Sequence, residues 1–129
     1  MIEILLGIII ILHGIVFLLY AGHSKRLFDL QKGMVWPNES WLLKNVIPEN
    51  SLRLLTFLIF IIFAVMFIIS GILFFIDNYL WKILIYIVSV ISSIFILLLW
   101  NGKNEKIADQ GGVGLLINLC ILMVLYFVY

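Results

Sequence analysis

Four long apolar runs occupy most of the chain, and they restrict its possible folds more than any other feature. The runs cover residues 2–21, 54–76, 79–100 and 113–129. Each approaches or exceeds the ~20 mostly apolar residues with which a helix crosses ~30 Å of hydrocarbon. Backbone groups inside lipid must satisfy their own hydrogen bonds, and no barrel-like polar and apolar alternation occurs. We therefore predict one all-α domain over residues 1–129, an integral membrane bundle of four transmembrane helices in up-down-up-down order.

The composition supports a membrane location. Hydrophobic residues make up 65% of the chain and charged residues 12%, so a water-soluble helical fold would leave most of its Leu, Ile and Phe uncovered. The first run has no preceding basic residue and no convincing small-x-small cleavage site, and Lys25 and Arg26 follow it as a stop signal, so we interpret it as a retained span rather than a signal peptide. The net charge of +1 and the lack of a dense basic cluster argue against a nucleic-acid partner.

Positive charges are distributed unequally between the two ends of the predicted bundle. Lys82 lies alone at the end that holds both termini. The other end carries seven basic residues: Lys25, Arg26, Lys32, Lys44, Arg53, Lys103 and Lys106. Because cytoplasmic loops are enriched in Lys and Arg, this asymmetry predicts that both termini face outward. Loops 22–51 and 101–112 would then lie in the cytoplasm, with the helices in the plasma membrane.

The connections between the runs also carry structural signals. Residues 24–31 are expected to continue the first helix beyond the membrane surface. Ser40 is positioned to cap a short helix at residues 41–44. Trp36 and Trp41 are expected at the level of the lipid headgroups. The second and third runs are separated only by two polar residues, Asp77 and Asn78, which predicts a tight antiparallel hairpin.

Small residues gather on one face of several predicted helices. Gly7, Gly14 and Ala21 recur every seven residues in the first span. Gly71 lies on the aromatic face of the second span, and Gly114 lies on the polar face of the fourth. Small residues allow the backbones of two membrane helices to approach closely. We interpret these five positions as helix-packing residues.

Four polar residues from three spans lie at similar predicted depth: His13, Ser89, Ser92 and Asn118. Unpaired polar groups are costly in hydrocarbon, so these side chains are expected to face the interior and bond one another. Phe63 and Phe67 share the interior face of the second span. We call His13, Ser89, Ser92 and Asn118 the predicted polar cluster. Either the cluster only holds the helices together, or, with the two phenylalanines, it binds a ligand, a proton or an ion.

Nearer the outer surface, Lys82 and Tyr86 continue the polar stripe of the third span that includes Ser89 and Ser93. Glu3 lies at a similar level on the interior face of the first span. The sequence therefore predicts an ion pair between Glu3 and Lys82 at the outer rim of the bundle.

The residue arrangements that mark common reaction chemistries are missing from the sequence. There is no nucleophile and base pair, no phosphate-binding glycine loop and no paired carboxylate, so no catalytic residue is assigned. His13 and His23 are ten residues apart and point in different directions, which argues against a shared haem iron, and no metal site is predicted. The single cysteine, Cys120, excludes an internal disulfide, and we interpret it as a small buried residue within a span.

One stretch resembles a known family. The segment from Gly14 to Lys25, GIVFLLYAGHSK, followed by Trp36 and Pro37, is similar to the opening of DoxX-like membrane proteins. Their first helix typically ends in a Gly, Phe, Gly, Lys pattern before a loop. The similarity covers about a quarter of the chain. It implies a four-helix membrane bundle, in a group where some members are linked to quinone-dependent redox complexes.

These observations lead to a primary functional hypothesis and two alternatives. The primary hypothesis is a non-catalytic subunit or scaffold of a membrane assembly, a homo-oligomer or one with a membrane-protein partner, with Gly7 and Gly14 at the contact and no cofactor. The first alternative is a carrier or binding protein for a quinone, a lipid or another small apolar molecule, held in a cavity bounded by His13, Phe63, Phe67, Ser89 and Asn118. The second is a small proton-linked transporter that depends on His13.

Overall fold

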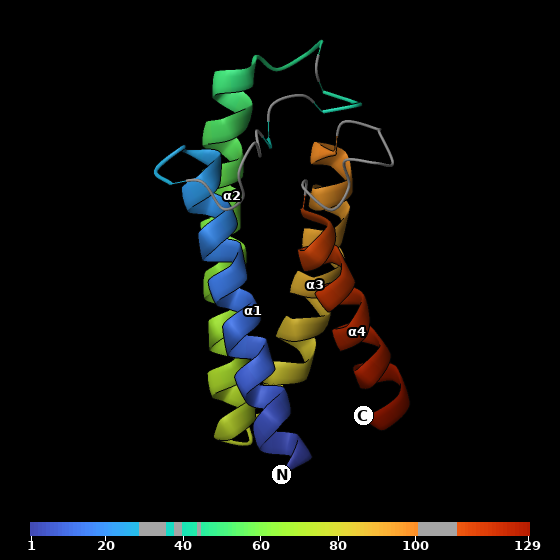
Figure 1. Cartoon of the computed structure of the whole chain (residues 1–129). Coiled ribbons are helices and arrows are strands. Elements are labelled where there is room, and N and C mark those ends of the chain that lie inside the picture. Colours follow the sequence, from blue (N-terminus) through green and yellow to red (C-terminus); the bar gives the residue numbers. More distant parts are fainter. Residues whose placement is uncertain (29–35, 38–39, 44, 101–110) are drawn as a thin grey trace.

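In the computed structural model, four helices run side by side and alternate in direction (Figure 1). They are α1 (Ile2–Ser24), α2 (Glu49–Phe75), α3 (Leu80–Leu99) and α4 (Val113–Val128). The structure describes residues 1–28, 36–37, 40–43, 45–100 and 111–129, and these contain no strand. The N- and C-termini lie at the same end of the bundle (Figure 1). The predicted all-α bundle with up-down-up-down order is confirmed.

The helices differ in how completely they could cross a membrane. Within the described residues, α1, α2 and α3 contain 23, 27 and 20 residues and are long and apolar enough to span a bilayer. The fourth helix is apolar but has 16 residues. The outward faces carry large apolar side chains, for example Leu12, Leu58 and Ile94, each more than half exposed. Such a surface is suited to lipid rather than water.

Helix α1 ends in a Schellman motif. The backbone N–H of Leu27 donates to the Gly22 carbonyl oxygen at 3.0 Å, and that of Arg26 donates to the His23 carbonyl oxygen at 2.9 Å. Arg26 adopts a left-handed φ of 59°, the conformation that turns a chain away from a helix axis. The predicted continuation of the helix past Ser24 is therefore wrong for the part of that segment that the structure describes.

The turn between α2 and α3 uses the same motif. Asp77 has a φ of 56°. The N–H of Asn78 donates to the Leu73 carbonyl oxygen at 2.9 Å, and the N–H of Asp77 donates to the Phe74 carbonyl oxygen at 3.1 Å. The side-chain oxygen of Asn78 then accepts from the N–H of Leu80, at 3.0 Å, where α3 begins. These bonds account for the predicted tight hairpin, which is confirmed.

The two tryptophans of the first loop have different environments. Trp41 is half exposed, and its indole Nε1 donates to the Leu97 carbonyl oxygen at 2.7 Å. Trp36, in contrast, is only 1% exposed and packs against Tyr20 and Phe60, with ring centroids 5.4 and 5.6 Å away. These two rings enclose Trp36 within the protein, and its position at headgroup level stays a prediction.

Ser40 links this loop to α3. Its hydroxyl donates to the Leu98 carbonyl oxygen, and its oxygen accepts from the N–H groups of Leu42 and Leu43 at 3.3 and 3.2 Å. Residues 41–43 form a turn rather than the predicted helix. The capping position of Ser40 was thus predicted correctly, although the helix that it was expected to cap is absent from the described part of the loop.

Small residues bring α1 and α2 into close contact. A Cβ atom at Gly14 would lie 2.8 Å from Ile68 Cγ1 and 2.9 Å from the carbonyl oxygen of Ala64. Gly71 of α2 faces Ile11 and the backbone of Gly7 in the same way. Gly7, Gly14 and Gly71, which we call the small-residue seam, therefore join two helices of one chain.

Candidate functional site

A buried hydrogen-bond network joins three helices at mid-depth. His13 of α1 and Asn118 of α4 are 1% and 0% exposed, and His13 Nε2 lies 2.6 Å from Asn118 Oδ1. The Asn118 amide nitrogen donates to the hydroxyl oxygens of Ser92 and Ser93 on α3, at 2.8 and 3.0 Å. We call His13, Asn118, Ser92 and Ser93 the polar network.

The network determines which His13 nitrogen carries the proton. Ser93 Oγ donates its hydrogen to the Ser89 carbonyl oxygen at 2.7 Å, so its oxygen acts as acceptor toward Asn118. The amide nitrogen of Asn118 is therefore assigned to the serine side, and its oxygen to His13. His13 donates through Nε2, which leaves a lone pair on Nδ1. Among the described residues this buried Nδ1 has no hydrogen-bond partner.

Ser89 occupies a different position from the one that the sequence suggested. The residue is fully buried, but its hydroxyl has no hydrogen-bond partner within the described chain. Its carbonyl oxygen, rather than its side chain, accepts from Ser92 and Ser93. Ser93 was predicted on the same stripe but not in the cluster. The sequence did contain a signal for its part in the network, since three serines lie within five residues of α3.

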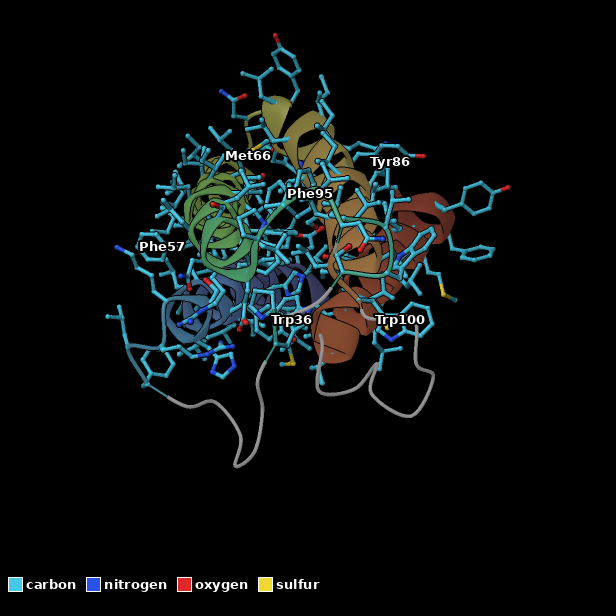
Figure 2. The ribbon with its side chains drawn as sticks, turned by 90° about the horizontal axis from the view of Figure 1, so that it is seen from above. Trp36, Phe57, Met66, Tyr86, Phe95 and Trp100 are labelled. Atoms are coloured by element: carbon cyan, nitrogen blue, oxygen red, sulfur yellow. The ribbon has the colours of Figure 1, made fainter. Side chains whose placement is uncertain are left out.

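Aromatic rings enclose His13. Its imidazole makes edge-to-face contacts with Phe67, at a centroid distance of 4.6 Å, and with Phe17, at 5.1 Å. Phe63 packs against Phe17 at 5.8 Å and against Phe95 at 5.7 Å, and Figure 2 shows Phe95 directed toward the centre of the bundle. Phe17 was not singled out as a site residue, although it contacts His13 from the next turn of α1. These contacts surround the imidazole with apolar rings.

The outer rim is arranged differently from the prediction. Glu3 and Lys82 line the same pocket, of about 750 Å³, at the end that holds the termini. They form no ion pair with each other in the described structure; Lys82 Nζ instead donates to the Tyr129 backbone oxygen at 2.6 Å. The predicted pair is therefore wrong, because the ammonium group reaches the end of α4.

The part of the predicted polar stripe on α3 that lies nearest the termini faces outward. Tyr86 is 57% exposed and extends from the outer side of α3 (Figure 2). Together with Lys82 it lines a second pocket, of about 310 Å³, between α3 and α4. Neither of these two pockets is lined by His13 or Asn118. Only the serines of the stripe lie toward the interior.

The fourth helix presents its cysteine outward. Cys120 is exposed, so the interpretation of this residue as buried is wrong. Its neighbours Leu119 and Met123 are also exposed, at 49% and 58%, which identifies this side of α4 as an outer face. The described residues contain no group of three or more His, Cys, Asp or Glu side chains that could hold a metal ion.

Comparison of the chain with protein-family models, with curated protein sequences and with solved structures finds no match. The resemblance of the first helix to DoxX-like proteins stays a prediction. Function must accordingly be argued from the site and the surface.

Proposed function

We propose that this protein is a non-catalytic subunit of a membrane assembly in which copies of the chain meet through the outer face of α4. A contact with another membrane protein through the same face is the related possibility. The observation that carries the proposal is a continuous stripe of exposed apolar side chains on α4 that includes a methionine and a tyrosine.

The stripe follows one side of α4. Leu116, Leu119, Met123 and Tyr126 are 62%, 49%, 58% and 82% exposed. Their spacing of three and four residues places them on a single helical face. Methionine and tyrosine are enriched at the cores of protein interfaces, and we define these four residues as the α4 stripe.

The seam of small residues does not supply this contact. Gly7 and Gly14 were expected at an assembly interface, but both face α2 of the same chain. The polar network also acts within the chain, since its four side chains make three hydrogen bonds between helices. Within this proposal the network orients α4, and the outward stripe makes the contact.

A second candidate function rests on one atom. His13 Nδ1 is buried and has no partner among the described residues, so it could accept a hydrogen bond from an O–H or N–H group of a small amphipathic molecule, such as a lipid or a quinol. The aromatic rings around His13 would have to separate to admit it. A carrier of this kind predicts a ligand that co-purifies with the wild type and is lost in His13→Phe.

Proton-linked transport would depend on the same side chain and predicts a pH-dependent flux that disappears in that variant.

The assembly proposal is tested by counting chains in lipid bilayers. Single-molecule photobleaching of labelled protein, diluted stepwise with lipid, should give two or more chains per particle. The double variant Leu116→Ala/Met123→Ala should shift the count to one. Its matched control, Leu5→Ala/Leu12→Ala, removes similarly exposed side chains from α1 and should leave the count unchanged. A wild type that is monomeric at every dilution and purifies without another membrane protein contradicts the proposal.

A further inference from the structure

All three charged side chains at the end of the bundle that holds the termini line one pocket. Glu3 comes from the start of α1, Asp77 from the turn between α2 and α3, and Lys82 from the first turn of α3. The sequence places no other charged side chain at this end of the bundle. The pocket of about 750 Å³ thus combines two carboxylates with one ammonium group.

Aromatic rings form the wall of this pocket. Trp81 makes edge-to-face contacts with Phe74 at 4.9 Å and with Tyr129 at 5.3 Å. All three residues line the pocket. The rings supply apolar surface, whereas the charges of the pocket come from Glu3, Asp77 and Lys82. Aromatic side chains of this kind are typical of the level at which a membrane meets water.

An apolar groove continues from the pocket. The second pocket, of about 310 Å³, shares Lys82 and Tyr129 with the first and is also lined by Leu122 and Leu125 of α4. Lys82 therefore lies where a charged cavity meets a mainly apolar groove between α3 and α4. The charged cavity, Lys82 and the apolar groove follow one another in the same order as the polar headgroup, the phosphate and the acyl chain of a phospholipid.

We propose that the two pockets bind one phospholipid with a primary-amine headgroup. Glu3 and Asp77 would accept hydrogen bonds from its ammonium group, and Lys82 would donate to its phosphate. An acyl chain would follow Leu122 and Leu125. A lysine ammonium group has three donors, of which the bond to Tyr129 uses one. A trimethylammonium headgroup has no N–H to give the carboxylates, and a glycerol headgroup has no positive charge.

The site and the α4 stripe share Tyr126, which also lines the second pocket, but no residue of a second copy is needed to form the site. It is built from one chain, so it should bind lipid whether or not copies of the chain associate. The two proposals can therefore fail separately.

Native mass spectrometry of the full chain in detergent provides the test. The protein is mixed with equal amounts of phosphatidylethanolamine, phosphatidylcholine and phosphatidylglycerol that have identical acyl chains. We expect the ethanolamine lipid to bind with a preference on the order of fivefold over each of the others, because exposed charge pairs typically change affinity by a few-fold. Equal binding of the three lipids, or a preference for the glycerol lipid, overturns the proposal.

Two variants separate the roles of the charges. Glu3→Gln/Asp77→Asn should abolish the headgroup preference, and asparagine preserves the left-handed turn because it tolerates positive φ. Lys82→Met should weaken binding of all three lipids. The control, Glu49→Gln, removes an exposed carboxylate from the opposite end of the bundle and should change nothing. A preference that persists in Glu3→Gln/Asp77→Asn also overturns the proposal.

Discussion

The His13 imidazole and the Asn118 side-chain amide lie 2.6 Å apart, although 105 positions separate them in the sequence. This bond ties α4 to α1, and Asn118 extends it to α3 through two serines. Closer to the loop end, the N–H of Gly114 donates to the Tyr20 hydroxyl oxygen at 3.0 Å. The rotation of α4 about its axis follows from these bonds, and so does the direction of its exposed stripe.

Replacing Asn118 by leucine should destabilise the bundle by about 2 kcal/mol, since the side chain makes three interhelical hydrogen bonds and each averages about 0.6 kcal/mol in membrane proteins. The free energy of unfolding, measured by denaturant titration in detergent, checks this value. Leu12→Ala, an exposed neighbour of His13, serves as control and should change the stability by less than about 0.5 kcal/mol. In a double-mutant cycle, His13→Phe and Asn118→Leu should be non-additive. Strict additivity of the two changes would mean that the bond contributes nothing.

Replacing Gly14 by leucine should destabilise the fold itself rather than only the assembly. Its first added carbon would meet the carbonyl oxygen of Ala64 at 2.9 Å, and a backbone atom cannot move aside as a flexible side chain can. Overpacking of this kind typically costs about 1–3 kcal/mol. The melting temperature in dilute detergent, where copies are separated, should fall in this variant but not in Ile15→Ala, whose side chain is exposed on the same helix. An unchanged melting temperature would contradict the packing described.

Removing the Tyr20 hydroxyl should loosen the start of α4. Gly114 lies in the first turn of that helix, where backbone N–H groups have no partner within the helix, and the Tyr20 oxygen accepts its hydrogen. In Tyr20→Phe the buried N–H loses this partner, at a cost of about 1 kcal/mol. Hydrogen exchange should accelerate at the N-terminal turn of α4 and stay unchanged in the middle of α2. Equal acceleration in both places would indicate global destabilisation instead.

The proposed topology predicts opposite accessibility of the two ends. With Cys120→Ser as background, a cysteine introduced by Tyr79→Cys at the turn between α2 and α3 should react with a membrane-impermeant maleimide on intact cells. Asn50→Cys, at the start of α2, should react only after the membrane is permeabilised. Both positions are exposed, so differences in burial do not affect the comparison. Labelling in the reverse pattern would invert the proposed orientation.

The helices and the polar network could largely be predicted because their signals are local. Apolar runs of membrane length identify helices, and a polar residue such as Asn118 in hydrocarbon requires a partner. The same reasoning could not choose between Ser89 and Ser93, because the two differ by about one helical turn and only the packed helices show which hydroxyl Asn118 reaches.

Other features depend on contacts that no local pattern encodes. Arg26 takes a left-handed conformation that is most common for glycine, so the end of α1 was predicted too late. Cys120 lies in a helix whose residues are nearly all apolar, and hydrophobicity alone cannot separate a lipid-facing position from a protein-facing one there. Lys82 binds the backbone of a residue 47 positions away, a contact that requires the relative placement of α3 and α4.

The most direct test of the assembly through α4 uses the single native cysteine. A spin label on exposed Cys120 reports the distance between neighbouring copies by pulsed electron paramagnetic resonance in bilayers, without any substitution. If the α4 stripes meet, with helix axes about 8–10 Å apart as in ordinary helix packing, the label pairs should give a short, narrow distance distribution that persists as lipid is added. A signal that contains only the background of randomly distributed single chains, at every lipid ratio, would contradict the account.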